Sequence, residues 1–189
     1  MIKKWETLGE RVIGNFKIFD LSWIKRRHPE KNKESEFVVL KSPKWVNIIP
    51  ITKEKNVILI EQYRHGCDEI TLEVPGGLVE KTEEPGVAGE RECLEETGYS
   101  SREKAILLGE NIPNPAFLTN TCYSYVWFNC EKISAQKLDL HEDIRVIEAP
   151  LKDIKKMIVD GKIRHSLVLT AFLFYFLKYS DSEFKSLKV

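Results

Sequence analysis

The sequence predicts an α+β fold in which helices pack on the faces of a mixed sheet. Three observations predict it. Short runs rich in β-branched and aromatic residues recur in both halves of the chain, one helical segment separates the two groups, and further helical segments follow near the end. The 189 residues are enough to bury a core in one domain of ordinary size.

The segments that precede the first helix are predicted to be strands. Residues 15–27 and 36–41 flank the charged, turn-forming segment 28–35, so we expect a β-hairpin there. Three further runs have strand composition and lead to a Pro-Gly-Gly turn: 45–51, 57–63 and 70–74.

The first helix is predicted over residues 85–97. Pro85 stands in its first turn and Gly98 follows its last residue, which is the usual asymmetry of helix ends. Val87 and Leu94 lie roughly opposite Glu92 on a helical projection, and we expect both to face the core.

Strands and then helices are predicted after this helix. The strands are 104–110, 122–131 and 144–149, and the helices are 150–161 and a segment that begins near residue 165. The apolar run 166–177 is shorter than the ~20 residues of a membrane-spanning helix, so we expect a buried terminal helix. The expected organisation is an N-terminal strand extension, a main domain and a polar tail, with boundaries at 1–43, 44–180 and 181–189.

The charge balance argues against two classes of partner. Lys plus Arg equals Asp plus Glu, at 29 each, so no overall field attracts nucleic acid or an anionic membrane, and we expect neither as a partner. The four cysteines form no CxxC pair and lie in or beside apolar runs, which favours buried thiols in a reducing cytoplasm. The first residues contain no apolar stretch of signal-peptide length, which also favours a cytoplasmic protein.

An unusual cluster of glutamates marks the first helix. Glu92, Glu95 and Glu96 are spaced three and four residues apart, so their carboxylates share one stripe of the helix, although like charges at this spacing repel. Carboxylate oxygens are hard ligands that suit Mg²⁺, with Mn²⁺ as a substitute. The sequence therefore predicts a divalent metal site, and the alternative is a solvated acidic face.

The residues around this cluster follow a long spaced pattern. Five residues separate Gly77 from Glu83, seven more precede Arg91-Glu92, and the pattern closes at Gly98-Tyr99. This resembles the Nudix box, G-x5-E-x7-R-E-U-x-E-E-x-G-U, with the one soft departure that Cys93 occupies a position usually held by a larger aliphatic residue.

The resemblance implies a Nudix-type α/β/α sandwich with an N-terminal β-hairpin extension. It also implies an enzyme that binds a divalent metal and cleaves a nucleoside diphosphate linked to another moiety. By position, the metal ligands or their close partners would be Glu92, Glu95, Glu96 and the carbonyl of Gly76. Arg91 would hold the glutamates by ion pairing, and Gly77, Glu83 and Gly98 would be structural.

Residues outside the box resemble the ADP-ribose and nucleoside-diphosphate-sugar branch of the family. They are the segments 61–66 (EQYRHG) and 73–77 (EVPGG), and Pro115, which lies 16 residues beyond Tyr99. The resemblance implies that Arg64 binds substrate phosphate and that Glu73 and Pro115 belong to the substrate site. A guanidinium fork suits phosphate oxygens, and the alternative for Arg64 is a surface ion pair.

The resemblance also implies a further acidic residue and a base-binding surface. The segment 139–149 resembles the loop that supplies another glutamate as metal ligand or general base, and Glu142 is a better candidate than Asp143 or Asp139. Trp45 and Trp23 are candidates for stacking on the nucleobase, although each could instead be a core or interface residue. Related enzymes often form homodimers with swapped N-terminal strands, so we expect a homodimer.

The implied reaction is hydrolysis of the pyrophosphate bond of ADP-ribose or a related nucleotide sugar, giving a nucleoside monophosphate and a sugar phosphate. One alternative is a Nudix hydrolase of different specificity, for GDP-mannose or another nucleotide. A second alternative is a non-catalytic Nudix sensor that binds ADP-ribose. The intact glutamate set of the box favours an enzyme over a sensor.

Overall fold

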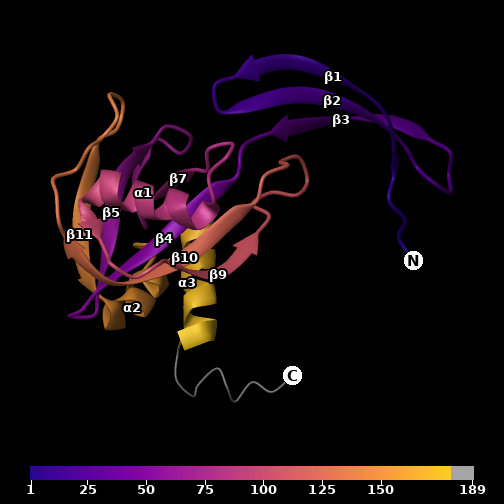
Figure 1. Ribbon diagram of the computed structural model, residues 1–189. Helices are drawn as coiled ribbons and strands as arrows, with labels where there is room; N and C mark the ends of the chain where they lie inside the picture. Colours follow the sequence, from indigo (N-terminus) through magenta and orange to yellow (C-terminus); the bar gives the residue numbers. More distant parts are fainter. Residues whose placement is uncertain (180–189) are drawn as a thin grey trace. The chain divides into compact units, whose positions relative to one another are not determined.

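The structure, a computed structural model, describes residues 1–179, and these fall into two compact units (Figure 1). The N-terminal unit comprises Met1–Pro43 together with Ile112–Thr121, and the larger unit contains the remaining described residues from Lys44 onward. The expected tail, residues 181–189, lies outside the described residues.

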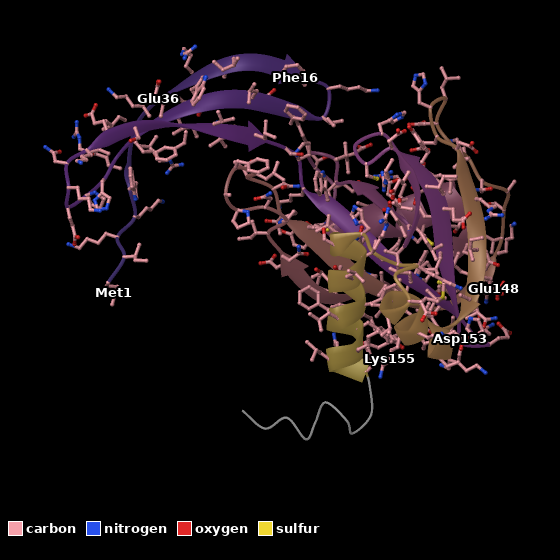
Figure 2. All side chains as sticks on the ribbon, turned by 180° about the vertical axis from the view of Figure 1, so that it is seen from behind. Met1, Phe16, Glu36, Glu148, Asp153 and Lys155 are labelled. Carbon is pink, nitrogen blue, oxygen red and sulfur yellow. The ribbon has the colours of Figure 1, made fainter. Side chains whose placement is uncertain are left out.

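The N-terminal unit is built on a three-stranded antiparallel sheet in the order β1-β2-β3 (Figure 2). The predicted hairpin is present as β2 (Phe19–Arg27) and β3 (Glu34–Lys41), but β1 (Glu6–Phe16) was not predicted. The pairing of β1 with β2 is irregular beside Gly9 and Gly14. Each irregularity changes which side chains face the same side of the sheet, so the sequence of β1 shows no strict alternation of apolar and polar residues, and the pattern did not predict a strand.

The segment Ile112–Thr121 joins the edge of β3 within this unit. The backbone N–H of Leu40 donates to the carbonyl of Phe117 at 2.8 Å, and the N–H of Thr119 donates to the carbonyl of Leu40 at 3.1 Å. Pro115 therefore belongs structurally to the N-terminal unit, although it lies far from β3 in the sequence.

The larger unit contains a mixed sheet in the order β11-β5-β4-β10-β8, with β6 on β5, β7 on β4 and β9 on β10. The central pair β4 and β10 is parallel, whereas β5 and β11 are antiparallel to each other. The sequence predicted six of these strands, but not β7 and β8, which are too short to show a period. The bounds are β4 (Trp45–Thr52), β5 (Asn56–Arg64), β6 (Glu69–Glu73), β7 (Gly76–Leu78), β8 (Tyr99–Ser100), β9 (Ile106–Asn111), β10 (Cys122–Lys132) and β11 (Ile144–Pro150).

Helices cover both faces of this sheet. Val46 and Ile48 of β4 pack in clusters with residues of α1 (Pro85–Thr97), whereas Ile49 and Ile51 pack with α3 (Ser166–Tyr179). Because successive side chains of a strand point to opposite faces, α1 and α3 lie on opposite sides of the sheet. The predicted α/β/α sandwich is therefore confirmed.

The C-terminal helices follow the prediction in part. The expected helix 150–161 is a 3-10 turn, η1 (Leu151–Asp153), followed by α2 (Ile154–Val159), and Figure 2 shows Asp153 and Lys155 where these two meet. The expected buried terminal helix is α3, which buries the five residues Leu167, Val168, Ala171, Phe172 and Tyr175. Within residues 1–179, no helix combines the length and apolar character needed to cross a membrane.

Two expectations about burial were wrong. Val87 is 56% exposed and Leu94 is only half-buried, because α1 packs through smaller residues, among them Ala88 and Gly89. A Cβ on Gly89 would lie 3.2 Å from a methyl group of Val46, so the helix approaches β4 closely at this point. Three cysteines are buried thiols as expected, but Cys67 is exposed.

Candidate active site

Gly76 and Gly77, predicted to form a turn, begin the short strand β7, which lies tightly against β4 and α1. Gly76 pairs with Asn47 in β4, and a Cβ on Gly76 would lie 2.2 Å from the carbonyl oxygen of Val46. A Cβ on Gly77 would lie 2.5 Å from the carboxylate of Glu92. A side chain at Gly76 would therefore displace the backbone of β4, and a side chain at Gly77 would displace the carboxylate of Glu92.

The helix α1 ends at Gly98, the second glycine of the box. Gly98 has a φ of 76°, and its N–H donates to the carbonyl of Leu94. This left-handed conformation is strained for residues with a Cβ, and an added Cβ would lie 2.1 Å from the carbonyl oxygen of Ser134. Gly98 thus lets the chain leave the helix and pass close beneath the loop after β10.

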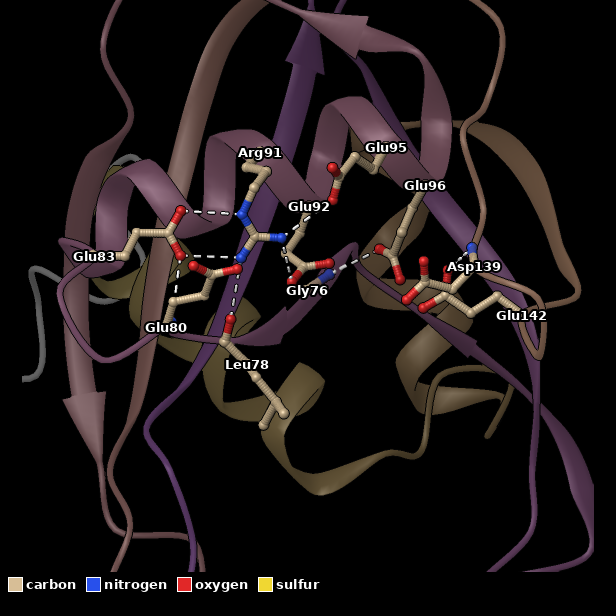
Figure 3. Close-up of polar contacts among 10 residues, drawn as sticks. All are labelled: Gly76, Leu78, Glu80, Glu83, Arg91, Glu92, Glu95, Glu96, Asp139 and Glu142. Carbon is tan, nitrogen blue, oxygen red and sulfur yellow. Dashed lines mark hydrogen bonds and ion pairs between the residues drawn. The ribbon is translucent and has the colours of Figure 1, made fainter. Parts of the chain in front are cut away.

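Arg91 gathers three glutamates around one guanidinium group (Figure 3). Its Nε and Nη2 donate to the two carboxylate oxygens of Glu83 at 3.0 Å each, and Nη1 donates to Glu92 at 2.9 Å and to Glu95 at 3.1 Å. Nη2 also donates to the carbonyl of Leu78. The hydrogen bonds from Arg91 lower the pKa of Glu83. The guanidinium therefore offsets part of the repulsion among these carboxylates.

Glu96 is turned away from Arg91 and is buried. Its side chain accepts a hydrogen bond from the N–H of Gly76 at 3.0 Å, and the residue is only 4% exposed. The pKa of Glu96 is raised to about 8, mainly by burial and also by the charges of Glu92 and Glu142, whereas the hydrogen bond from Gly76 and the charge of Arg64 act in the opposite direction. Glu96 is thus a buried carboxylate that forms no ion pair among the described residues.

Glu92 connects the two groups of carboxylates. Burial raises the pKa of Glu92, Arg91 lowers it in part, and the neighbouring charges of Glu95 and Glu142 raise it again. The net direction is upward, so a single guanidinium does not neutralise the cluster.

The loop after β10 brings Glu142 to these carboxylates. The side-chain amide of Gln136 donates to the carbonyl of Glu96 at 2.6 Å and to that of Ile144 at 3.0 Å, which ties the end of α1 to the start of β11. Glu142 in turn accepts a hydrogen bond from the N–H of Asp139 at 2.9 Å. Figure 3 shows the carboxylates of Glu96, Asp139 and Glu142 directed toward the same region beside Gly76. Nothing in the sequence indicated the bridging role of Gln136.

The donor chemistry of this region fits a hard dication. The side chains here that could ligate a metal all present carboxylate oxygens. Burial and mutual repulsion raise the pKa of Glu92 and Glu96, and a bound cation would lower the pKa of both groups. Over residues 1–179, no three acidic, His or Cys side chains are already spaced to hold one ion. Binding of a cation would therefore require side chains of this cluster to change position.

Arg64, the last residue of β5, and Glu73, the last residue of the antiparallel strand β6, form an ion pair through their side chains. Nε and Nη2 of Arg64 each donate to one carboxylate oxygen of Glu73 at 2.8 Å, and Glu73 is only 3% exposed. Burial favours a higher pKa for Glu73, but the hydrogen bonds and charge of Arg64 outweigh it and lower the pKa overall. The sequence placed both residues in the substrate site, and the structure places the Glu73 carboxylate against Arg64.

The aromatic candidates lie at separate places. Trp23 is half-buried in β2 of the N-terminal unit, and Trp45 is half-buried at the start of β4 in the larger unit. Pro115 lines a cavity of about 610 Å³ in the N-terminal unit, together with Trp5 and Phe37, whose rings meet edge to face at 5.5 Å. Neither Trp23 nor Trp45 is among the described residues that line it. Trp5 and Phe37 were not candidates, because nothing in the sequence joins them to Pro115.

Comparisons with known proteins point to one family. Residues 41–169 match the model of the NUDIX domain. The chain is 27% identical over 181 residues to the ADP-ribose pyrophosphatase of Bacillus subtilis (strain 168), a match that covers 94% of each chain. It is 31% identical over 134 residues to the methanol dehydrogenase activator of Bacillus methanolicus, covering 70% of this chain and 72% of the relative.

Two further matches concern specificity and fold. The chain is 30% identical over 120 residues to the GDP-mannose pyrophosphatase of Yersinia pestis (strain Pestoides F), covering 59% of this chain and 60% of the relative. A crystal structure of an ADP compounds hydrolase superposes with a TM-score of 0.83 at 19% identity, covering 96% of this chain and 98% of that one. The structural match supports the fold described above.

Proposed function

The chain belongs to the Nudix family of hydrolases, and from that premise we propose that it cleaves the pyrophosphate bond of ADP-ribose or a related nucleoside diphosphate sugar. The products are a nucleoside monophosphate and a sugar phosphate. The observation that carries the proposal is the buried carboxylate of Glu96, held beside Gly76 and repelled by Glu92 and Glu142.

We propose Mg²⁺ as the cofactor, with Mn²⁺ as a substitute. Glu92, Glu95, Glu96, Glu142 and the carbonyl of Gly76 would hold it. When bound, the dication stabilises the charge that develops on the pyrophosphate oxygens and lowers the pKa of coordinated water. Hard oxygen donors and uncompensated negative charge in the cluster support this choice over softer metals.

Different residues are proposed to orient the glutamates and to accept the proton of the attacking water. Arg91 keeps Glu92 and Glu95 together through hydrogen bonds from Nη1, and Gly76 orients Glu96 through its N–H. Glu142 accepts a proton from the attacking water as the water oxygen bonds to one phosphorus and the bridging P–O bond breaks. The half-buried position of Glu142, next to Glu92 and Glu96, supports it over the exposed Asp139 and Asp143.

Substrate recognition is proposed to use cationic and aromatic groups outside the box. Arg64 contacts a phosphate oxygen, and Trp23 or Trp45 stacks on the nucleobase. Replacement of either tryptophan with Ala is expected to raise KM for ADP-ribose, and an unchanged KM removes that residue from the site.

The base and sugar of the substrate are tested with a panel. ADP-ribose, GDP-mannose and other nucleotide sugars are incubated with Mg²⁺, and phosphate released after phosphatase treatment is measured. Preferred turnover of GDP-mannose supports the second candidate, which the similarity to the Yersinia pyrophosphatase favours. Cleavage of only nucleoside triphosphates or dinucleoside polyphosphates contradicts the assignment to nucleotide sugars.

A sensor without catalysis is the remaining alternative, and Glu96→Gln separates it from an enzyme. We expect this variant to fold and to lose several orders of magnitude in kcat, because the cation that Glu96 helps to hold lowers much of the barrier. An ADP-ribose-binding protein with no measurable turnover in the wild type contradicts the enzyme.

We propose that the chain acts as a cytoplasmic homodimer. The three buried free thiols support a reducing compartment, and the exposed apolar residues of the N-terminal sheet, including Val12, Ile13 and Phe16, support its role as a dimer-forming element. Size-exclusion chromatography with light scattering tests the dimer, and a monomer at micromolar concentration contradicts it.

A further inference from the structure

Glu73 is a charged residue buried at the end of β6, where no step of the proposed reaction uses it. It pairs with Ile60 in the register of β5 and β6 and is 3% exposed. A buried carboxylate is costly unless it is paired and hydrogen-bonded, so its position requires a specific partner. That partner is Arg64, which stands at the end of the neighbouring strand.

Three hydrogen bonds hold the Glu73 carboxylate in one orientation. Two come from Nε and Nη2 of Arg64 at 2.8 Å, and the third comes from the hydroxyl of Thr71 at 2.5 Å. Thr71 is itself buried and precedes Glu73 by two residues on the strand, so both side chains lie on the same face. Each oxygen of the carboxylate is therefore engaged, and the group is fixed before any ligand arrives.

This arrangement decides which part of Arg64 can meet a ligand. The Nε and Nη2 edge, which could otherwise form a two-point contact with phosphate, is occupied by Glu73. The Nη1 group takes no part in this pair, and the Arg64 side chain remains 42% exposed. The guanidinium plane is thus held by its inner edge while another part of it stays accessible.

We propose that Glu73 is a positioning residue that orients Arg64, so that the Nη1 group of Arg64 contacts a phosphate of the nucleotide sugar. This inference rests on the proposed function, because it takes Arg64 as the phosphate-binding residue. It replaces the simpler expectation of a two-point phosphate contact through the Nε edge. Glu73 itself does not touch the substrate and acts through Arg64.

A double-mutant cycle in KM tests the inference. Glu73→Gln keeps the shape of the side chain but removes its charge and one acceptor, and we expect KM for ADP-ribose to rise about tenfold with kcat nearly unchanged, because binding of ground and transition state weakens equally. In the Arg64→Ala background the same substitution is expected to have no further effect on KM. A rise in KM of similar size in both backgrounds, or none in either, overturns the inference.

The matched control is Glu131→Gln, on β10. Glu131 is exposed and pairs with Ser100 of β8, away from Arg64 in the sheet order, so the same chemical change there is expected to leave KM unchanged. If Glu73→Gln fails to fold, Thr71→Val replaces it. That variant removes only the hydroxyl that fixes Glu73, and we expect a smaller rise in KM that again requires Arg64.

Failure of the proposed function gives a different result. If the wild type does not turn over ADP-ribose, the substrate assignment fails, and the cycle is repeated with the panel nucleotide that is cleaved. If none is cleaved, the four proteins are titrated with ADP-ribose by calorimetry, with Kd in place of KM. The same pattern of effects is expected, and a Kd that Glu73→Gln does not raise overturns the inference.

Discussion

Substitution with Ala is predicted to affect the adjacent glycines Gly76 and Gly77 of β7 differently, lowering stability at Gly76 and activity at Gly77. In Gly76→Ala, the new Cβ would lie 2.2 Å from the backbone carbonyl oxygen of Val46, which is about 1 Å closer than contact distance. Neither group can rotate away, so β7 must separate from β4 at Asn47. Overpacking of this kind costs on the order of 3 kcal/mol. At about 2–4 °C per kcal/mol for a chain of this size, the Tm falls by about 6–12 °C.

In Gly77→Ala, the new Cβ would lie 2.5 Å from the carboxylate of Glu92, the mobile end of a side chain. The carboxylate rotates away and the fold survives, at a cost of about 1 kcal/mol for its weakened hydrogen bond to Arg91. Displacement of a site group by about 1 Å can lower turnover by about 100-fold. We therefore expect Gly77→Ala to lose activity while its Tm stays near that of the wild type.

Thermal unfolding and steady-state hydrolysis of ADP-ribose with Mg²⁺ measure both variants. Glu80→Ala is a matched surface control from the loop between Gly77 and α1, and we expect it to change neither quantity. A stable Gly76→Ala protein, or a Gly77→Ala protein with wild-type turnover, refutes the reasoning from contact distances.

Three further predictions concern charge. Arg91→Ala leaves Glu83 without its two charged hydrogen bonds, so the free energy of unfolding in urea falls by about 2 kcal/mol, whereas Arg91→Lys retains part of it. In EDTA, the free energy of unfolding is expected to fall as the pH rises from about 5 to 8, because folding raises the pKa of Glu96 from 4.5 to about 8. Glu96→Gln is expected to make this pH dependence shallower. Mg²⁺ at about 100 times its Kd raises stability by about 2.7 kcal/mol, and no rise in Tm with nucleotide present contradicts the metal site.

The sequence predicted those parts of the molecule that local rules determine. Pro85 and Gly98 marked both ends of α1, and the spacing of the glutamates placed them on one helix. These local rules did not predict which side of the helix is buried, because packing against the sheet determines it. Val87 suited a core position by its chemistry, yet the helix approaches β4 through Gly89, and that approach depends on the whole sheet.

Contacts between residues that lie far apart in the sequence could not be predicted either. Glu73 was assigned to the substrate site from its neighbours in the chain, but its orientation depends on Arg64, which lies opposite Glu69 in the register of β5 and β6 and reaches Glu73 with its side chain. The segment around Pro115 likewise became part of the N-terminal unit through its backbone contacts with Leu40. Strand register and loop docking of this kind leave no periodic signal in a single sequence.

The directions of the pKa shifts of Glu73, Glu83 and Glu96 distinguish carboxylates that are paired with an arginine from one that is not. Glu73 and Glu83 each receive two hydrogen bonds from one arginine, and their pKa values are lowered. Within residues 1–179, the carboxylate of Glu96 accepts a hydrogen bond only from the backbone N–H of Gly76, and burial with two carboxylate neighbours raises its pKa. A chain selected for stability alone would pair or replace such a group, because its charged form is destabilised at neutral pH. Carboxylates with raised pKa values gather at functional sites, and a ligand that carries positive charge is what makes the Glu96 position favourable.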